Sequence, residues 1–115
     1  MVTVAQLRVC EAYGANACSP AEGSRVGVSA NLRGDSWPVN GLRHRAEDNS
    51  NGWYLWRGDA LSTADDFFEP LHVEHLHEWC PEVEQFLALP PGWRFLIAPG
   101  FEDVWFDPSL LEHDG

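Results

Sequence analysis

The stretch LPPGWRFLIAPGFEDVWFD, residues Leu89 to Asp107, decides the fold of this chain. An almost wholly apolar run leads into Pro99-Gly100, and a second run follows in which acids alternate with large aromatic residues. This pattern predicts a β-hairpin with a two-residue turn, so that Ala98 pairs with Phe101. Because Pro-Gly favours a type II turn, a longer loop with a shifted register is the alternative.

The two-residue turn sorts the side chains of the hairpin onto two faces, since strand side chains alternate. The face expected to cover the core carries Trp93, Phe95, Ile97, Val104 and Phe106, with Glu102 near the turn. The other face carries Arg94, Leu96, Phe101, Asp103, Trp105 and Asp107. There we expect Arg94 to stack on Trp105 and to reach the acids diagonal to it. One arginine cannot neutralise three carboxylates, so negative charge remains beside exposed aromatic surface.

The remaining segments predict a single α+β domain over residues 1–115, with a mostly antiparallel sheet. Two helices are expected, an N-terminal one capped by Thr3 and stopped by Gly14, and a short one that begins at a proline before the hairpin. The segment Leu71–Trp79 is ambiguous between strand and helix. The helices span Val4–Tyr13 and Pro81–Leu89, and the strands span Ser24–Leu32, Val39–Arg45 (a short edge strand broken by Gly41) and Trp53–Gly58.

Charge is distributed unevenly along the chain, whose net charge is −11 without any lysine. Residues 1–58 hold six arginines against five acids, whereas residues 59–115 hold thirteen acids against one base, Arg94. Such an acidic half repels phosphate, which excludes direct binding of nucleic acid or of an anionic membrane. It attracts a cationic partner, although acidity that only maintains solubility is the simpler alternative.

Targeting and redox signals are sparse. No apolar stretch approaches the roughly 18 residues of a membrane span, and no basic segment precedes the GANAC sequence at Gly14–Cys18. We therefore expect no export and a cytoplasmic location. Cys10, Cys18 and Cys80 are odd in number and lack CxxC spacing, which favours reduced thiols over disulfides.

One cluster has the composition of a metal site. His72, His75, His77 and Cys80 form H-x2-H-x-H-x2-C, and imidazole and thiolate are zinc ligands. Structural zinc sites usually take two pairs of ligands from separate elements, so packed or solvated histidines are the simpler interpretation. No serine lies in a nucleophile elbow, and no glycine-rich phosphate loop is present. We expect no catalytic residues and no cofactor.

Several motifs resemble a bacterial immunity-protein family of polymorphic-toxin systems, numbered thirty-three among their immunity families and formerly a domain of unknown function. The similarity covers roughly residues 24–111 and leaves the N-terminal helix, about residues 3–14, outside. The motifs are an acid-to-GW loop at Glu47–Trp53, W-x-G-[DE] at Trp56–Asp59, DFF-x-P-L-H at Asp66–His72, and LPPGWRF followed by EDVW-[FY]-D within Leu89–Asp107; WPVNGLRH at Trp37–His44 is similar to the preceding strand.

The resemblance implies an α+β fold and a non-catalytic protein that binds and neutralises a cognate toxin in the producing cell. Together with the charge, it favours a basic toxin such as a nuclease, and leaves a peptidase or a deaminase open. A small-ligand or metal-binding regulatory module that uses the His72–Cys80 segment is the alternative. The oligomeric state is left open. The toxin-binding residues expected are Asp65, Asp66, Glu69, Glu102, Asp103 and Asp107, with Trp105 as an aromatic anchor.

Overall fold

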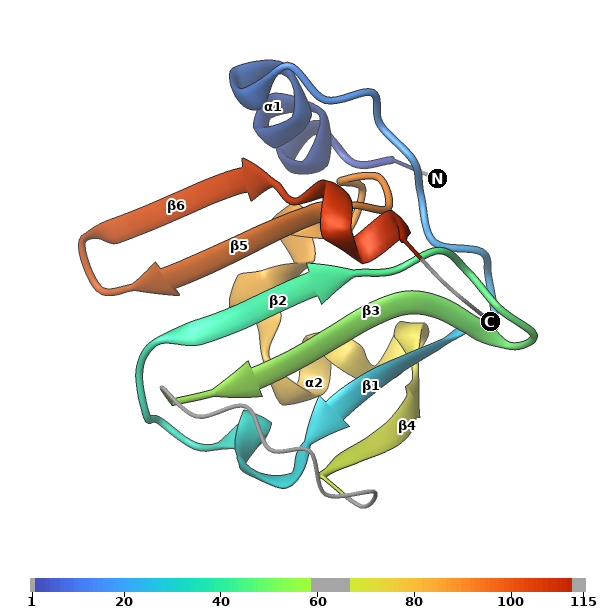
Figure 1. Cartoon of the computed structure of the whole chain (residues 1–115). Coiled ribbons are helices and arrows are strands. Elements are labelled where there is room, and N and C mark those ends of the chain that lie inside the picture. Colours follow the sequence, from blue (N-terminus) through green and yellow to red (C-terminus); the bar gives the residue numbers. More distant parts are fainter. Residues whose placement is uncertain (1, 59–66, 113–115) are drawn as a thin grey trace.

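The hairpin predicted from the sequence lies at one edge of a six-stranded sheet (Figure 1). A computed structural model describes residues 2–58 and 67–112 of the chain. In strand order the sheet is β4-β1-β3-β2-β5-β6, and every neighbouring pair is antiparallel except β1 with β3. The elements are α1 (Val4–Tyr13), β1 (Arg25–Ser29), η1 (Ala30–Arg33), β2 (Val39–Arg43), β3 (Ser50–Arg57), β4 (Phe68–His72), η2 (Val73–His75), α2 (Leu76–Trp79), η3 (Pro81–Phe86), β5 (Trp93–Ala98), β6 (Phe101–Phe106) and η4 (Pro108–Leu111), where η marks a 3-10 helix. The α+β prediction is confirmed.

The register of the β5–β6 hairpin is the one that the two-residue turn requires. Ala98 pairs with Phe101, Arg94 with Trp105 and Leu96 with Asp103. Phe95, Ile97 and Val104 are buried on the face that carries the core, as expected. Phe106 shares that face but is exposed, because it lies at the end of the strand, where the ring of Trp93 is its neighbour. The shifted register is thereby excluded.

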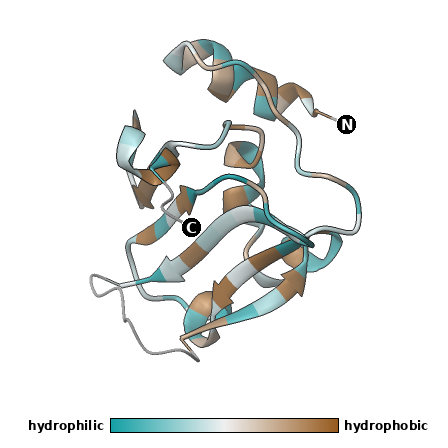
Figure 2. Cartoon of the chain, turned by 45° about the vertical axis from the view of Figure 1, so that its right-hand side comes forward, coloured by the Kyte–Doolittle hydropathy of each residue, from teal (hydrophilic) through white to brown (hydrophobic). Residues whose placement is uncertain are grey.

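The core fills the space between one face of the sheet and the helices behind it (Figure 1). Alternate strand residues point into this core, for example Val26 and Val28 of β1 and Trp53 and Leu55 of β3. The hydropathy of successive residues alternates along the strands accordingly (Figure 2). A smaller cluster on the opposite face, the open face, joins Leu42, Trp56 and Leu110, so η4 covers part of that face.

Helix α1 begins and ends where the sequence indicates. The Thr3 hydroxyl accepts a hydrogen bond from the Gln6 amide, and Gly14 adopts φ 73° at the C-terminal end. The buried side of the helix is narrow and consists of Gln6, Val9 and Cys10, whereas Val4 and Leu7 are exposed. The Gln6 side chain donates to the Glu84 carbonyl, which ties the helix to η3.

Four sequence-based boundaries are wrong. The strand expected over Trp53–Gly58 is β3, which begins at Ser50 and ends at Arg57. The predicted edge strand Val39–Arg45 is β2, which ends at Arg43 and lies inside the sheet between β3 and β5. The predicted helix Pro81–Leu89 is the 3-10 helix η3, since its buried residues Val83 and Phe86 recur every third position. The strand expected over Ser24–Leu32 stops at Ser29 and continues as η1. The ambiguous segment after Pro70 contains both structures, the end of β4 followed by η2 and α2.

Candidate functional site

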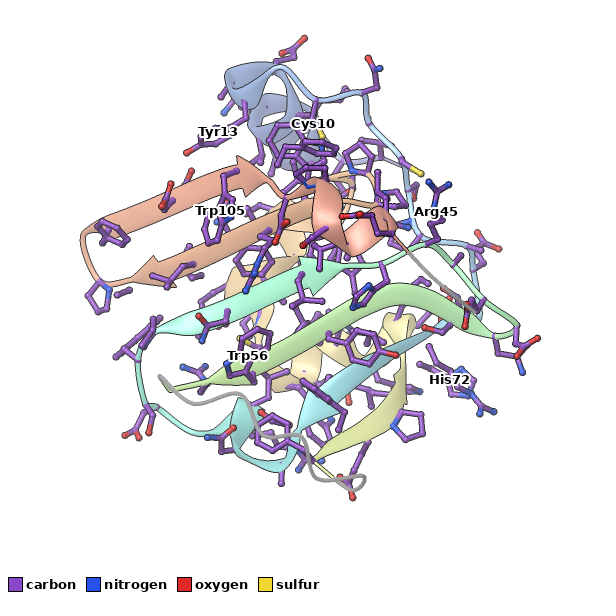
Figure 3. All side chains as sticks on the ribbon, viewed as in Figure 1. Cys10, Tyr13, Arg45, Trp56, His72 and Trp105 are labelled. Atoms are coloured by element: carbon purple, nitrogen blue, oxygen red, sulfur yellow. The ribbon has the colours of Figure 1, made fainter. Side chains whose placement is uncertain are left out.

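On the open face of the hairpin, an arginine, a tryptophan and two acids form a cross-strand group. The Arg94 guanidinium lies 5.4 Å from the ring centroid of Trp105, and its Nη1 is 3.2 Å from Oδ2 of Asp107. Asp103 lies opposite Leu96, one pair nearer the turn, and is exposed. The expected stacking of Arg94 on Trp105, which is labelled in Figure 3, and the ion pair of Arg94 with Asp107 are both present. The exposed Asp103 carboxylate lies outside this ion pair.

Asp107 also has a structural task. Its Oδ1 accepts hydrogen bonds from the Ser109 amide at 3.0 Å and from the Ser109 hydroxyl at 2.6 Å, so it caps η4. The Ser109 hydroxyl, with Arg94 beside it, holds the pKa of this carboxyl below its ordinary value. Asp107 is therefore fixed by neighbours within the chain, and Asp103 is the less constrained of the two acids.

Glu102 points to the other face of the hairpin, toward α1. The Tyr13 hydroxyl donates a hydrogen bond of 2.7 Å to its Oε2. This hydrogen bond, helped by burial, raises the pKa of Tyr13 to about 12. The donor in this contact is a neutral hydroxyl, so Tyr13 brings no positive charge to the Glu102 side chain.

The acids expected to form one surface are divided by the order of the strands. Glu69 lies on β4 and Glu102, Asp103 and Asp107 lie on or directly after β6, at opposite edges of the sheet. Five strand spacings separate these edges, which is about 24 Å. Asp65 and Asp66 lie outside the described residues. The structure therefore brings Asp103, Trp105 and Asp107 together on one face of the hairpin, with Glu102 on its other face, and leaves Glu69 at the opposite edge of the sheet (Figure 1).

The histidine-rich segment does not gather its four candidate ligands. His72, His75 and His77 are exposed, and the ring centroids of the first two are 6.3 Å apart. Cys80 is buried in the core, where its sulfur accepts a hydrogen bond of 3.5 Å from Arg57. Within residues 2–58 and 67–112, no three His, Cys, Asp or Glu side chains are arranged to hold a metal ion.

Burial separates the three thiols, and their reactivity is expected to follow it. Cys18 is exposed, whereas Cys10 and Cys80 are buried. Burial raises the pKa of both buried thiols, that of Cys80 to about 11. At pH 8, about one Cys80 thiol in a thousand is then ionised.

We expect an aromatic disulfide reagent at pH 8 to modify one thiol of the native protein within minutes, and three after unfolding in guanidinium chloride. Mass spectrometry of the digested product should locate the rapid modification at Cys18. Rapid modification of Cys80 would show that its site is more open than the structure indicates.

Arg43 and Arg57 contribute two of the positive charges in the sequence, but the structure buries both side chains. Arg43 donates to the carbonyls of Cys18, Leu87 and Leu89 through Nη1 and to that of Asn51 through Nε. Arg57 is equally buried. Both arginines occupy positions of their strands that face the core. The alternation of every second residue in the sequence indicates these positions, but an arginine is ordinarily expected at the surface. The surface is consequently more acidic than the difference between acids and arginines suggests.

The structure is thus a six-stranded α+β domain with an acidic, aromatic hairpin at one edge and two arginines buried in its interior. Residues 5–107 match the Imm33-like domain, so the chain belongs to the Imm33-like family. The match includes nearly all of α1, which the resemblance in the motifs had left outside. Neither the curated proteins nor the solved structures contain a match to the chain. None of the helices in the described part of the chain has the length and apolar character needed to cross a membrane.

Proposed function

We propose that this protein is a non-catalytic immunity protein that binds a cognate toxin in the cytoplasm of the producing cell and neutralises it through the β5–β6 hairpin. The observation that carries the proposal is the concentration of exposed carboxylates at this hairpin, where Glu102 and Asp103 lie next to exposed aromatic surface. Membership of the Imm33-like family supports the same function. No cofactor enters this function.

A basic toxin, with a nuclease favoured, fits this surface by charge. Lysines and arginines that bind phosphate in a nuclease would pair with the hairpin carboxylates, while the aromatic rings exclude water from these pairs. Such binding occludes the phosphate site and speeds the encounter through long-range attraction. A peptidase or a deaminase is compatible with the same surface but gains less from its charge.

The test is a pull-down with the tagged protein as bait against the products of the genes adjacent to its own. One basic toxin domain is expected to bind with nanomolar affinity, and the affinity should fall about tenfold or more between 50 and 500 mM salt. In calorimetry, Asp103→Asn should weaken binding, whereas Glu69→Gln at the opposite edge of the sheet should leave it within about twofold. Absence of binding by every neighbour at low salt would refute the function. Equal effects of both variants would refute the hairpin as the binding surface.

A further inference from the structure

On the face of the hairpin opposite Asp103, the tip overhangs η3 and leaves a hollow of about 670 Å³, here called the Trp37 groove. Three separate segments line it: the loop before β2, the helix η3 and the turn between β5 and β6. The side chains that give it chemical character are Trp37, Glu82, Gln85 and Glu102. None of these segments adjoins another in the sequence, so the groove is a product of the tertiary structure.

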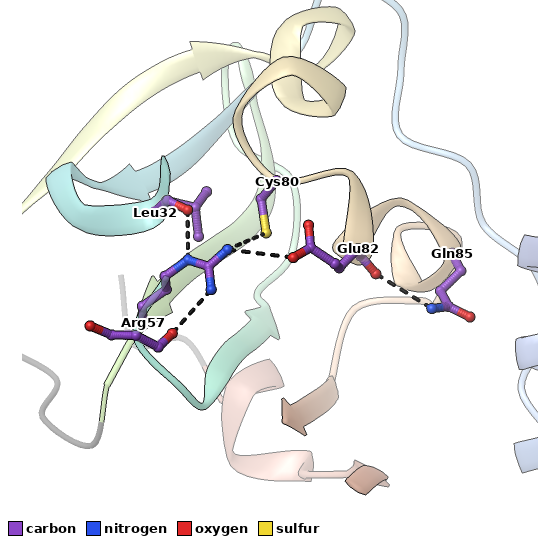
Figure 4. Close-up of polar contacts among 6 residues, drawn as sticks. Leu32, Arg57, Cys80, Glu82 and Gln85 are labelled. Atoms are coloured by element: carbon purple, nitrogen blue, oxygen red, sulfur yellow. Dashed lines mark hydrogen bonds and ion pairs between the residues drawn. The ribbon is translucent and has the colours of Figure 1, made fainter. Parts of the chain in front are cut away.

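The buried Arg57 holds two walls of the Trp37 groove in place (Figure 4). Its Nε donates to the Leu32 carbonyl at 2.7 Å and its Nη1 to the Ser36 carbonyl at 3.0 Å. The guanidinium carbon then lies 5.2 Å from the ring centroid of Trp37, while Nη2 is 3.6 Å from Oε2 of Glu82. One arginine thus orients both the aromatic wall and one of the acidic walls.

The charge of the groove is negative. Its described lining contains two carboxylates and no lysine, arginine or histidine. Arg57 compensates Glu82, whereas the hydrogen bond that Glu102 accepts in the described part of the chain comes from the neutral Tyr13 hydroxyl. Within the described residues, an uncompensated carboxylate therefore remains at the rim, near the Trp37 side chain, which is 41% exposed.

We propose that the Trp37 groove receives an arginine or lysine side chain of the toxin. This inference rests on the proposed function and assigns to it a specific contact on the second face of the hairpin. The cation pairs with Glu102, and its aliphatic stem lies along Trp37, whose aromatic face attracts cations and apolar methylenes. Anionic ligands are repelled by the same carboxylate.

The first test uses the protein alone and a defined probe. An acetylated and amidated Gly-Arg-Gly-Arg-Gly peptide is titrated into the isotope-labelled protein and followed by NMR, with its citrulline counterpart as the uncharged control. Saturable shifts of the Trp37 indole and the Glu102 amide are expected with the arginine peptide. In Glu102→Gln the affinity should fall about fivefold or more, whereas Glu69→Gln, at the opposite edge of the sheet, should leave it within about twofold. Equal shifts with the citrulline peptide, or shifts confined to other residues, would overturn the proposal.

The second test uses the toxin domain recovered in the pull-down. Glu102→Gln and Trp37→Ala should each weaken its binding about tenfold or more, with thermal unfolding checked for both variants. If the toxin binds the wild type and both variants equally, the groove is excluded while the immunity function stands. If no toxin binds at all, the function fails, and the peptide titration still decides whether the groove takes a cation.

Discussion

Replacing Arg43 with methionine should lower the free energy of unfolding by about 4 kcal/mol, a large part of the stability of a domain of this size. The methionine keeps the apolar stem but removes the donors for four main-chain carbonyls, those of Cys18, Asn51, Leu87 and Leu89. The Leu87 carbonyl keeps the Trp53 indole as a donor at 3.0 Å, whereas the Asn51 and Leu89 carbonyls lose their hydrogen bonds to Arg43 in the interior without regaining water. Burial lowers the pKa of Arg43, yet a guanidinium remains protonated at neutral pH.

Urea unfolding followed by tryptophan fluorescence measures this loss. Arg43→Lys should give an intermediate stability, because one ammonium group can take the place of Nη1 but not also that of Nε at the Asn51 carbonyl. Arg45→Met is the matched control, since Arg45 is exposed and makes one hydrogen bond of 3.3 Å to the Leu111 carbonyl. Its effect should stay within about 0.5 kcal/mol. If Arg43→Met costs no more than Arg45→Met, the carbonyls are satisfied without the guanidinium and this account of the interior is wrong.

The sequence predicts the hairpin well because the information in it is local. Alternation with period two assigns Phe95, Ile97 and Val104 to one face, and the two residues Pro99 and Gly100 fix the register. The N-terminal helix follows from an equally local signal, the cap at Thr3 and the stop at Gly14. In each case the residues that determine the structure lie within a few positions of one another.

What the sequence does not reveal is non-local. The order of the strands places Glu69 and Glu102 at opposite edges, and no property of either segment specifies that distance. Arg43 and Arg57 resemble surface cations until the sheet encloses them. The Trp37 groove combines residues as distant in the chain as Trp37, Glu82 and Glu102, so no motif marks it. The candidate site can therefore be located on the hairpin from the sequence, but its shape cannot.

Gly41 shows how tertiary contacts reverse a local preference, and its replacement by valine should lower the free energy of unfolding by about 3 kcal/mol. In an isolated strand the change favours folding, since valine has the higher β propensity and glycine costs about 0.5–1 kcal/mol. In this sheet, however, a Cβ on Gly41 would collide with the Phe95 ring. That ring is buried and stacks on Phe86 with a centroid distance of 4.4 Å, so it has nowhere to move.

A double-mutant cycle separates this steric cost from other effects of the substitution. Gly41→Ala alone should destabilise the protein, and Phe95→Leu alone should do so by loss of the stacked ring. Combined, they should cost at least about 1 kcal/mol less than the sum, because leucine leaves room for the new methyl group. Additive costs would mean that the Phe95 ring is not what excludes a side chain at position 41. If Gly41→Val instead raised the free energy of unfolding, β propensity would outweigh packing at this position, as expected for a strand at an open edge.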